Sequence, residues 1–174
     1  EVIVSFTPNP AVDKTFVVRG LVHGAQNRAD ESHVDPGGKG INVSRMVHRL
    51  GRPTLAVAVL GGHMGRMLAR ALHDEGVASH VVWTHAETRL NVILVDSAID
   101  ASTRVWDRGP HADDDVTQEL LALARRSAAG AAVFVAGGTL LPGMPPDLHA
   151  TALAAAARCG ARTILDADGE ALRL

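Results

Sequence analysis

Short apolar segments alternate along this chain with segments whose apolar residues recur at helical spacing. The pattern predicts strands near residues 1–6, 55–60, 80–84, 131–136 and 162–166, and helices at about 41–50, 63–75, 114–128 and 146–158. Strands that alternate with helices favour an α/β fold with a largely parallel sheet, because parallel neighbours need a crossover connection. The 174 residues are enough for one domain with a substantial core.

Two stretches do not fit this alternation, because their candidate strands are more polar. They lie near residues 14–35 and 89–107, and we expect them to form a small accessory sheet inserted into the main layer. On a strand, Arg89 and Asn91 share one face while Leu90 points the other way. The planar fork of arginine matches phosphate or carboxylate oxygens, although a solvated arginine on a strand edge would explain the pattern equally well.

A glycine-rich stretch precedes the first predicted helix and reads Pro36-Gly37-Gly38-Lys39-Gly40-Ile41-Asn42. Glycine allows a close approach that a Cβ would block, and a helix start offers free N–H groups and a positive dipole end. These features suit a loop on which a small polar ligand lies against the main chain, with Lys39 adding charge. An ordinary strand-to-helix turn remains the alternative.

Two further positions lie where ligands gather in open α/β sheets, outside the carboxyl ends of the strands. Asp13 follows the turn after the first strand, and its carboxylate could accept hydrogen bonds from sugar hydroxyls. Gly137–Gly143 follows the strand at 131–136, where a substrate loop is expected. A solvated aspartate and a tight turn are the simpler explanations of these two features.

Composition excludes several classes of function. The net charge of −2 gives no basic surface for nucleic acid. The P-loop and dinucleotide fingerprints are missing, and the nine histidines lack metal-ligand spacing, so we expect no structural metal site. Cys159 is the only cysteine, and neither a membrane-spanning run nor a signal peptide is recognisable. We therefore expect a cytoplasmic protein without membrane contacts.

Several segments together resemble the N-terminal half of the PfkB (ribokinase-like) carbohydrate kinases. They are Thr-Pro-Asn-Pro-Ala-Val-Asp at 7–13, Gly-Gly-Lys-Gly-Ile-Asn-Val at 37–43 and Glu-Thr-Arg-Leu-Asn at 87–91. Two later segments of this chain resemble the branch of the family that holds 1-phosphofructokinase and tagatose-6-phosphate kinase. Residues 138–143 are similar to the Gly-Ser-Leu-Pro-Pro-Gly loop of that branch, and residues 165–172 are similar to its Leu-Asp-Thr-Ser-Gly-Glu-Ala-Leu segment. All matches follow the family's order along the chain.

The resemblance implies a ribokinase-like three-layer α/β/α fold with a small β lid that covers the sugar and often mediates dimerisation. We therefore expect a homodimer formed through the lid. The implied reaction transfers the γ-phosphoryl group of ATP, with Mg²⁺, to a hydroxyl of a ketose phosphate. The first expected substrate is fructose 1-phosphate, which would become fructose 1,6-bisphosphate. Tagatose 6-phosphate and fructose 6-phosphate are the alternatives.

The resemblance also implies a substrate site built from hydroxyl-binding and phosphate-binding residues. Those expected to hold sugar hydroxyls are Asp13, Gly38 and Asn42. Those expected at the phosphate are Lys39, Arg89, the supporting Asn91 and, from the lid, Arg28. The glycine-rich loops of the site contribute Gly37 and Gly138.

The chain departs from the family pattern in two ways. Trp106 stands where relatives often carry asparagine, before Gly109 and Pro110, which could reshape the lid. The Gly-Ala-Gly-Asp motif, which supplies the catalytic base in the family, does not occur in the sequence. We therefore interpret residues 1–174 as the N-terminal, sugar-binding part of a kinase domain, which has no kinase activity alone. A non-catalytic sugar-phosphate-binding or dimerisation module is the alternative.

Overall fold

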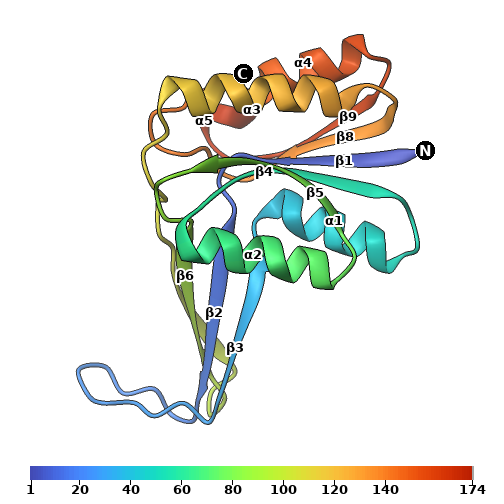
Figure 1. The fold of residues 1–174 in the computed structure, drawn as a ribbon. Coiled ribbons are helices and arrows are strands. Elements are labelled where there is room, and N and C mark those ends of the chain that lie inside the picture. Colours follow the sequence, from blue (N-terminus) through green and yellow to red (C-terminus); the bar gives the residue numbers. More distant parts are fainter. Residues whose placement is uncertain (174) are drawn as a thin grey trace.

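Five parallel strands form the central sheet of the computed structural model, which describes residues 1–173 (Figure 1). In spatial order they are β5 (Ala78–Thr84), β4 (Thr54–Gly61), β1 (Val2–Thr7), β8 (Ala131–Gly137) and β9 (Arg162–Asp166). Every neighbouring pair is parallel. The carboxyl ends of the strands therefore meet along one edge of the sheet, where a ligand site is expected.

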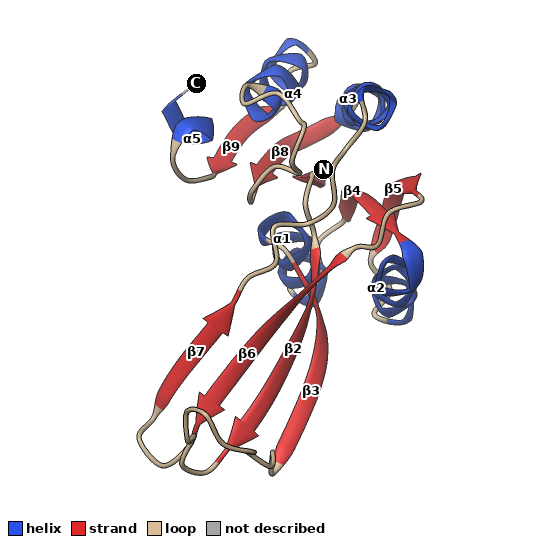
Figure 2. Ribbon diagram, turned by 90° about the vertical axis from the view of Figure 1, so that its left-hand side faces the viewer, coloured by secondary structure: helices blue, strands red, loops and turns tan. Residues whose placement is uncertain are grey.

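Helices cover both faces of this sheet. Figure 2 shows α1 (Lys39–Arg49) and α2 (Gly62–Asp74) on one face, and α3 (Asp114–Ala128) and α4 (Leu148–Arg158) on the other; α5 (Glu170–Arg173) is a short last turn. No helix within residues 1–173 is long and apolar enough to cross a membrane.

Each face of the sheet has its own apolar core, because each long helix buries one stripe of its surface. The core beneath α3 and α4 includes Phe6, Leu120, Phe134 and Leu148. The core beneath α1 and α2 includes Ile41, Leu60, Leu68 and Leu72. The predicted α/β fold with a mostly parallel central sheet is confirmed.

The polar strands form a second sheet, which we call the lid. Its order is β3 (Glu31–Gly37), β2 (Ala11–Val18), β6 (Arg89–Asp96) and β7 (Ala101–Val105), and it projects from the central sheet (Figure 2). Asp13 follows the turn after β1, as expected, but the lid strand begins before residue 14, where the sequence placed its start. The prolines after β1 interrupt the chain only briefly, and pairing begins again at Ala11, so Asp13 lies within β2.

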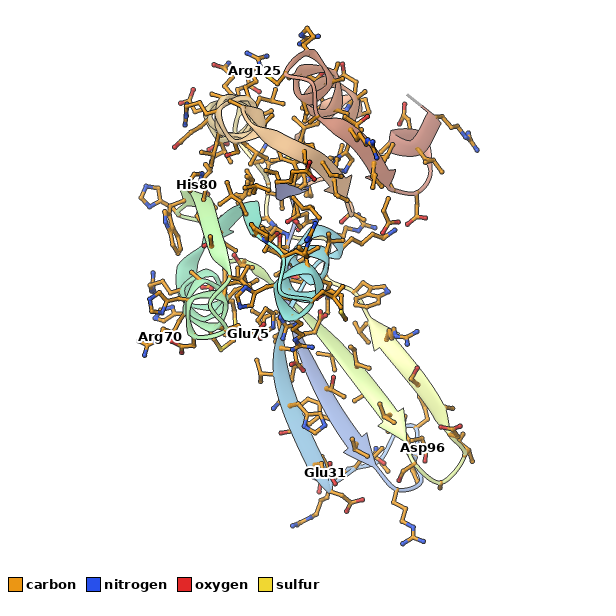
Figure 3. The ribbon with its side chains drawn as sticks, turned by 90° about the vertical axis from the view of Figure 1, so that its right-hand side faces the viewer. Glu31, Arg70, Glu75, His80, Asp96 and Arg125 are labelled. Atoms are coloured by element: carbon orange, nitrogen blue, oxygen red, sulfur yellow. The ribbon has the colours of Figure 1, made fainter. Side chains whose placement is uncertain are left out.

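The far end of the lid is tied together by Asp96 at the end of β6 (Figure 3). Its carboxylate accepts hydrogen bonds from the backbone N–H groups of Leu21, Gly20 and Ala98 at 2.8–3.0 Å. These backbone donors stabilise the charged form and lower the pKa of Asp96. The loop after β2 is thereby fixed to the end of β6.

Arg45 on α1 joins three elements beside the glycine-rich loop. It contacts Glu75 through Nε at 2.7 Å and Nη2 at 2.5 Å, and it donates to the Pro36 carbonyl at 3.0 Å. Glu75 follows α2, and Figure 3 places it toward α1. The hydrogen bonds from Arg45 lower the pKa of Glu75 below its ordinary value of 4.5.

We predict that Arg45→Met lowers the free energy of unfolding near pH 7 by about 1–3 kcal/mol, because a half-buried carboxylate loses its partner. Since the native pKa of Glu75 is lowered, the pair's contribution is complete above 4.5 and disappears as the pH falls through the native pKa. The difference in urea unfolding between the wild type and Arg45→Met should therefore shrink at acid pH.

The matched control is Arg70→Met on α2. Arg70 pairs with Asp74 four residues later, and the two side chains are 77% and 55% exposed (Figure 3). Its removal should leave the free energy of unfolding nearly unchanged, because solvent screens an exposed ion pair. A loss for Arg45→Met that stays constant from neutral to acid pH would contradict the assignment.

Candidate functional site

A cavity of about 780 Å³ opens where the lid joins the carboxyl edge of the central sheet. Seven of the residues predicted for a substrate site line it, namely Asp13, Gly38, Lys39, Asn42, Arg89, Asn91 and Gly138. Its other walls come from Trp106–Arg108, 139–144 and Asp168. The fold thus brings together residues that are more than a hundred positions apart in the sequence.

The glycine-rich loop connects β3 to the start of α1. Gly38 has a φ of 112°, a left-handed conformation that favours glycine. A Cβ on Gly38 would lie 3.1 Å from the Pro10 Cα, and one on Gly40 would meet the Thr7 hydroxyl. The glycines are therefore needed for packing against the end of β1. The two interpretations of this stretch, a strand-to-helix turn and a ligand-binding loop, are compatible, since Gly38 and Lys39 also line the cavity.

Asp13 and Asn91 face each other across the parallel pair of β2 and β6. Asn91 is buried and donates from Nδ2 to the Asp13 carboxylate at 2.8 Å. Its carbonyl oxygen accepts the Asp107 backbone N–H at 3.2 Å, which sets the orientation of the amide. Within residues 1–173 the Asp13 carboxylate has no second hydrogen-bond donor, so its remaining acceptor capacity is available to a ligand hydroxyl.

Arg89 precedes Asn91 by two residues on β6, so it lies on the same face of the strand and nearer to the central sheet. Each of its side-chain nitrogens donates to a backbone carbonyl: Nη2 to Asn9 at 2.9 Å, Nη1 to Asp107 at 2.9 Å and Nε to Pro10 at 3.4 Å. Burial lowers the pKa of Arg89, opposed by the nearby charges of Asp13 and Asp107. Arg89 therefore holds the main chain, and only one N–H on each Nη is left for a ligand.

Lys39, at the start of α1, is not a free cation. Its ammonium group lies 2.8 Å from an Asp166 carboxylate oxygen and 3.4 Å from one of Asp168. The hydrogen bond to Asp166 is the main cause that raises the pKa of Lys39. A ligand phosphate that approached Lys39 would have to compete with these two carboxylates.

Two predicted residues lie outside the cavity lining. Gly37 packs against Asp13, and a Cβ there would collide with its carboxylate. Arg28 lies in the exposed loop that joins β2 and β3, at the end of the lid far from the central sheet (Figure 1). This fold does not bring Arg28 to the cavity of its own chain, and its phosphate contact stays a prediction.

The sequence reasoning missed Asn9, which does not line the cavity but joins two of the segments that form its wall. Asn9 is 2% exposed, and its Nδ2 donates to the Arg108 carbonyl at 2.9 Å, the Thr139 hydroxyl at 3.1 Å and the Leu140 carbonyl at 3.3 Å. Asn9 therefore joins the segment after β7 to the loop after β8. Its place within the motif at 7–13 was the only available signal, because all three partners are distant in sequence.

His149 on α4 holds the opposite wall from behind. It is fully buried, and its Nε2 lies 2.9 Å from the Gly138 carbonyl, so Nε2 must carry the proton. Its ring packs edge-on against Phe6, and its Nδ1 has no hydrogen-bond partner within residues 1–173. Burial lowers the pKa of His149 below 6.5. Since the Gly138 N–H donates to the Asp166 carbonyl at 3.0 Å, both backbone polar groups of Gly138 are hydrogen-bonded.

Comparison with known proteins gives a consistent family. The pfkB family carbohydrate kinases match residues 7–173. The ATP-dependent 6-phosphofructokinase isozyme 2 of Mycobacterium tuberculosis is 34% identical over 171 residues, which are 98% of this chain and 50% of the relative. The 1-phosphofructokinase of Haloferax volcanii is 35% identical over 147 residues, which are 82% of this chain and 46% of the relative. This chain spans about half the length of these relatives.

Solved structures have the same fold. A possible 1-phosphofructokinase from Thermotoga maritima superposes with a TM-score of 0.94 at 24% identity, over 99% of this chain and 56% of the other. The phosphofructokinase-2 from Escherichia coli in complex with fructose-6-phosphate gives 0.90 at 29% identity, over 98% and 56%. The architecture described above therefore covers just over half of each of these chains.

Two substitutions of His149 should distinguish the stability that comes from its hydrogen bond to Gly138 from the pH dependence that comes from its lowered pKa. Because its native pKa is lowered, the unfolded chain binds a proton that the native chain does not, and stability falls as the pH drops below 6.5. Urea unfolding at about pH 5 and pH 7.5 measures this slope. We predict that His149→Gln, which keeps an N–H donor, removes that slope.

His149→Phe should remove the same pH dependence and also lose about 1 kcal/mol at neutral pH, because the Gly138 carbonyl loses its donor. His85→Gln is the control, since His85 is exposed and has no side-chain hydrogen bond among the described residues. A pH slope that survives in His149→Gln would contradict the assignment.

Proposed function

Because the chain belongs to the pfkB family of carbohydrate kinases, we propose that it is the sugar-phosphate-binding part of an ATP-dependent kinase acting on a ketose phosphate. The observation that carries this proposal is the placement of a carboxylate and a guanidinium on adjacent lid strands, above a cavity bordered by the glycine-rich loop. Residues 1–174 then correspond to the N-terminal part of the kinase domain, with the lid strands inserted.

The cavity suits a reaction that depends on positioning more than on covalent chemistry by the protein. Asp13, oriented by Asn91, would accept hydrogen bonds from ketose hydroxyls, and the exposed Asn42 amide would add a further polar contact. Arg89 would face the substrate's existing phosphate with its remaining N–H groups. Lys39 would join it where the phosphate displaces Asp166. A lid over the ligand would exclude water and limit hydrolysis of ATP.

Fructose 1-phosphate is the first proposed substrate, and its product would be fructose 1,6-bisphosphate. The 1-phosphofructokinase among the relatives supports this choice. The 6-phosphofructokinase among them supports fructose 6-phosphate as the alternative, and tagatose 6-phosphate is a third candidate.

ATP with Mg²⁺ is the proposed phosphoryl donor, and the metal would neutralise charge on the transferred group. No group of three His, Cys, Asp or Glu side chains gathers as a metal site within residues 1–173. The Gly-Ala-Gly-Asp segment is also missing from the sequence. We therefore assign the base and the nucleotide contacts to the part of the kinase fold that this chain does not span.

A non-catalytic binding or dimerising module is the second candidate, and the lid supports it. Val34, Leu90 and Val105 are 46%, 38% and 58% exposed, and the strand register puts them on the face opposite Asp13. An uncovered apolar sheet face suits association with a second copy of the chain. The proposed homodimer would form through the lid.

We predict that the full chain binds fructose 1-phosphate in isothermal titration calorimetry and that Asp13→Asn weakens binding about 10- to 100-fold. The variant keeps the shape of the side chain but loses charge-assisted hydrogen bonds to hydroxyls. Asp35→Asn is the matched control, because Asp35 is paired with Asp13 across β2 and β3 but does not line the cavity. Equal affinity in the wild type and Asp13→Asn would contradict the assignment.

The same chain, supplied with ATP and Mg²⁺, should show no turnover of fructose 1-phosphate in a coupled assay for ADP. Measured turnover would mean that the base lies within these 174 residues. Titration of fructose 6-phosphate and tagatose 6-phosphate alongside fructose 1-phosphate ranks the three substrates.

A further inference from the structure

The segment that follows β7 is held by the cavity's own side chains. Asn91 accepts the Asp107 N–H at 3.2 Å, and Arg89 donates to the Asp107 carbonyl at 2.9 Å. Asn9 donates to the Arg108 carbonyl at 2.9 Å, and the Gly109 N–H turns back to the Asp107 carboxylate at 3.0 Å. The main chain of this segment is therefore fixed, although it lies outside any regular element.

Two side chains of this segment have no polar interaction partner within residues 1–173. Trp106 and Arg108 both line the cavity and are exposed, the indole to 57%. Neither side chain makes a hydrogen bond or an ion pair within residues 1–173, and nothing in the fold of this chain explains their presence. Tryptophan and arginine are enriched among the residues that carry most of the binding energy at contact surfaces, because both offer a large planar group.

The other cations of the cavity are already engaged. Each side-chain nitrogen of Arg89 donates to a main-chain carbonyl, and the Lys39 ammonium lies between two carboxylates. Arg108 is thus the cation in the described cavity wall that has no partner of its own. Asp107 and Asp168 also line the cavity, but both carboxylates already have a partner. Asp107 accepts a hydrogen bond from the Gly109 N–H, and Asp168 accepts one from the Lys39 ammonium group.

We propose that Arg108 and Trp106 determine the specificity of this site: Arg108 binds the phosphate of the ketose phosphate, and Trp106 packs against the sugar. The guanidinium fork matches two phosphate oxygens, and an indole provides an apolar wall for the C–H groups of the substrate. Arg89 would add its two remaining N–H groups at the same phosphate, and it also clamps the main chain that carries Arg108. The inference rests on the proposed function and names the group that reads the phosphate.

The two tryptophans of the chain allow a direct test. Trp83 lies on β5 outside the cavity, so Trp83→Phe leaves Trp106 as the only indole, in the full chain. Adding fructose 1-phosphate to this variant should change the Trp106 emission saturably, whereas Trp106→Phe, which keeps Trp83, should show no change. Calorimetry with the same variants measures binding independently of the fluorophore.

In the Trp83→Phe chain, Arg108→Ala should weaken fructose 1-phosphate binding about 10- to 100-fold, because a charge-assisted hydrogen bond to phosphate is lost. Arg108→Lys should retain part of that affinity, since it keeps the charge without the fork. Unphosphorylated fructose should bind equally weakly with and without Arg108. Arg104→Ala is the matched control, because Arg104 lies on β7 nearby but outside the cavity lining.

The outcomes separate this inference from the proposed function. If the parent chain binds none of the three ketose phosphates, the proposed function fails and the inference fails with it. If the parent binds and Arg108→Ala binds equally well, only the inference fails. An equal loss of affinity for fructose and for fructose 1-phosphate in Arg108→Ala would also overturn it, because the effect would not depend on the phosphate. The urea unfolding midpoints of Arg108→Ala and Arg108→Lys show whether each variant is folded. If one of them is not folded, the affinity of the folded variant tests the inference.

Discussion

The parallel register between β2 and β6 determines where the lid side chains of the candidate site lie. It pairs Ala11 with Arg89 and Asp13 with Asn91, so a carboxylate and a guanidinium share one face of the lid. Side chains alternate along a strand, and a slip of one residue would turn Leu90 toward the cavity and Asn91 away from it. The hydrogen bond from Asn91 to Asp13 and the clamp made by Arg89 both depend on this register.

The polar groups of the cavity support one another before any ligand arrives. Lys39 pairs with Asp166 across the sheet edge, Asn9 holds the main chain on two sides, and His149 holds Gly138 from the core. Such a site is pre-organised, so binding loses little conformational entropy. The consequence is that a ligand must exchange existing contacts for new ones. Groups without partners, such as the Arg108 side chain, can bind without that exchange.

The alternation of strands and helices predicted most elements to within a few residues, and the polarity of 14–35 and 89–107 predicted a separate small sheet. These features are local, because periodicity reports which face of an element is buried. The start of the first lid strand was placed too late, at about residue 14, because nothing local shows that pairing begins again directly after Pro10. The engagement of Lys39 by Asp166 and of Arg89 by Asn9 could not be read from the chain, since each pair is widely separated in sequence.

The amino-acid sequence by itself determined the fold class, the two glycine-rich loops and the set of polar residues that could meet a ligand. Hydrophobic periodicity, the conformational freedom of glycine and side-chain chemistry are properties of short segments, so they can be derived from the amino-acid sequence alone. Only the tertiary structure decided which of those polar groups are occupied by partners and which are left for a ligand. That distinction depends on distances between segments as far apart as Asn9 and Thr139, and long-range packing alone sets those distances.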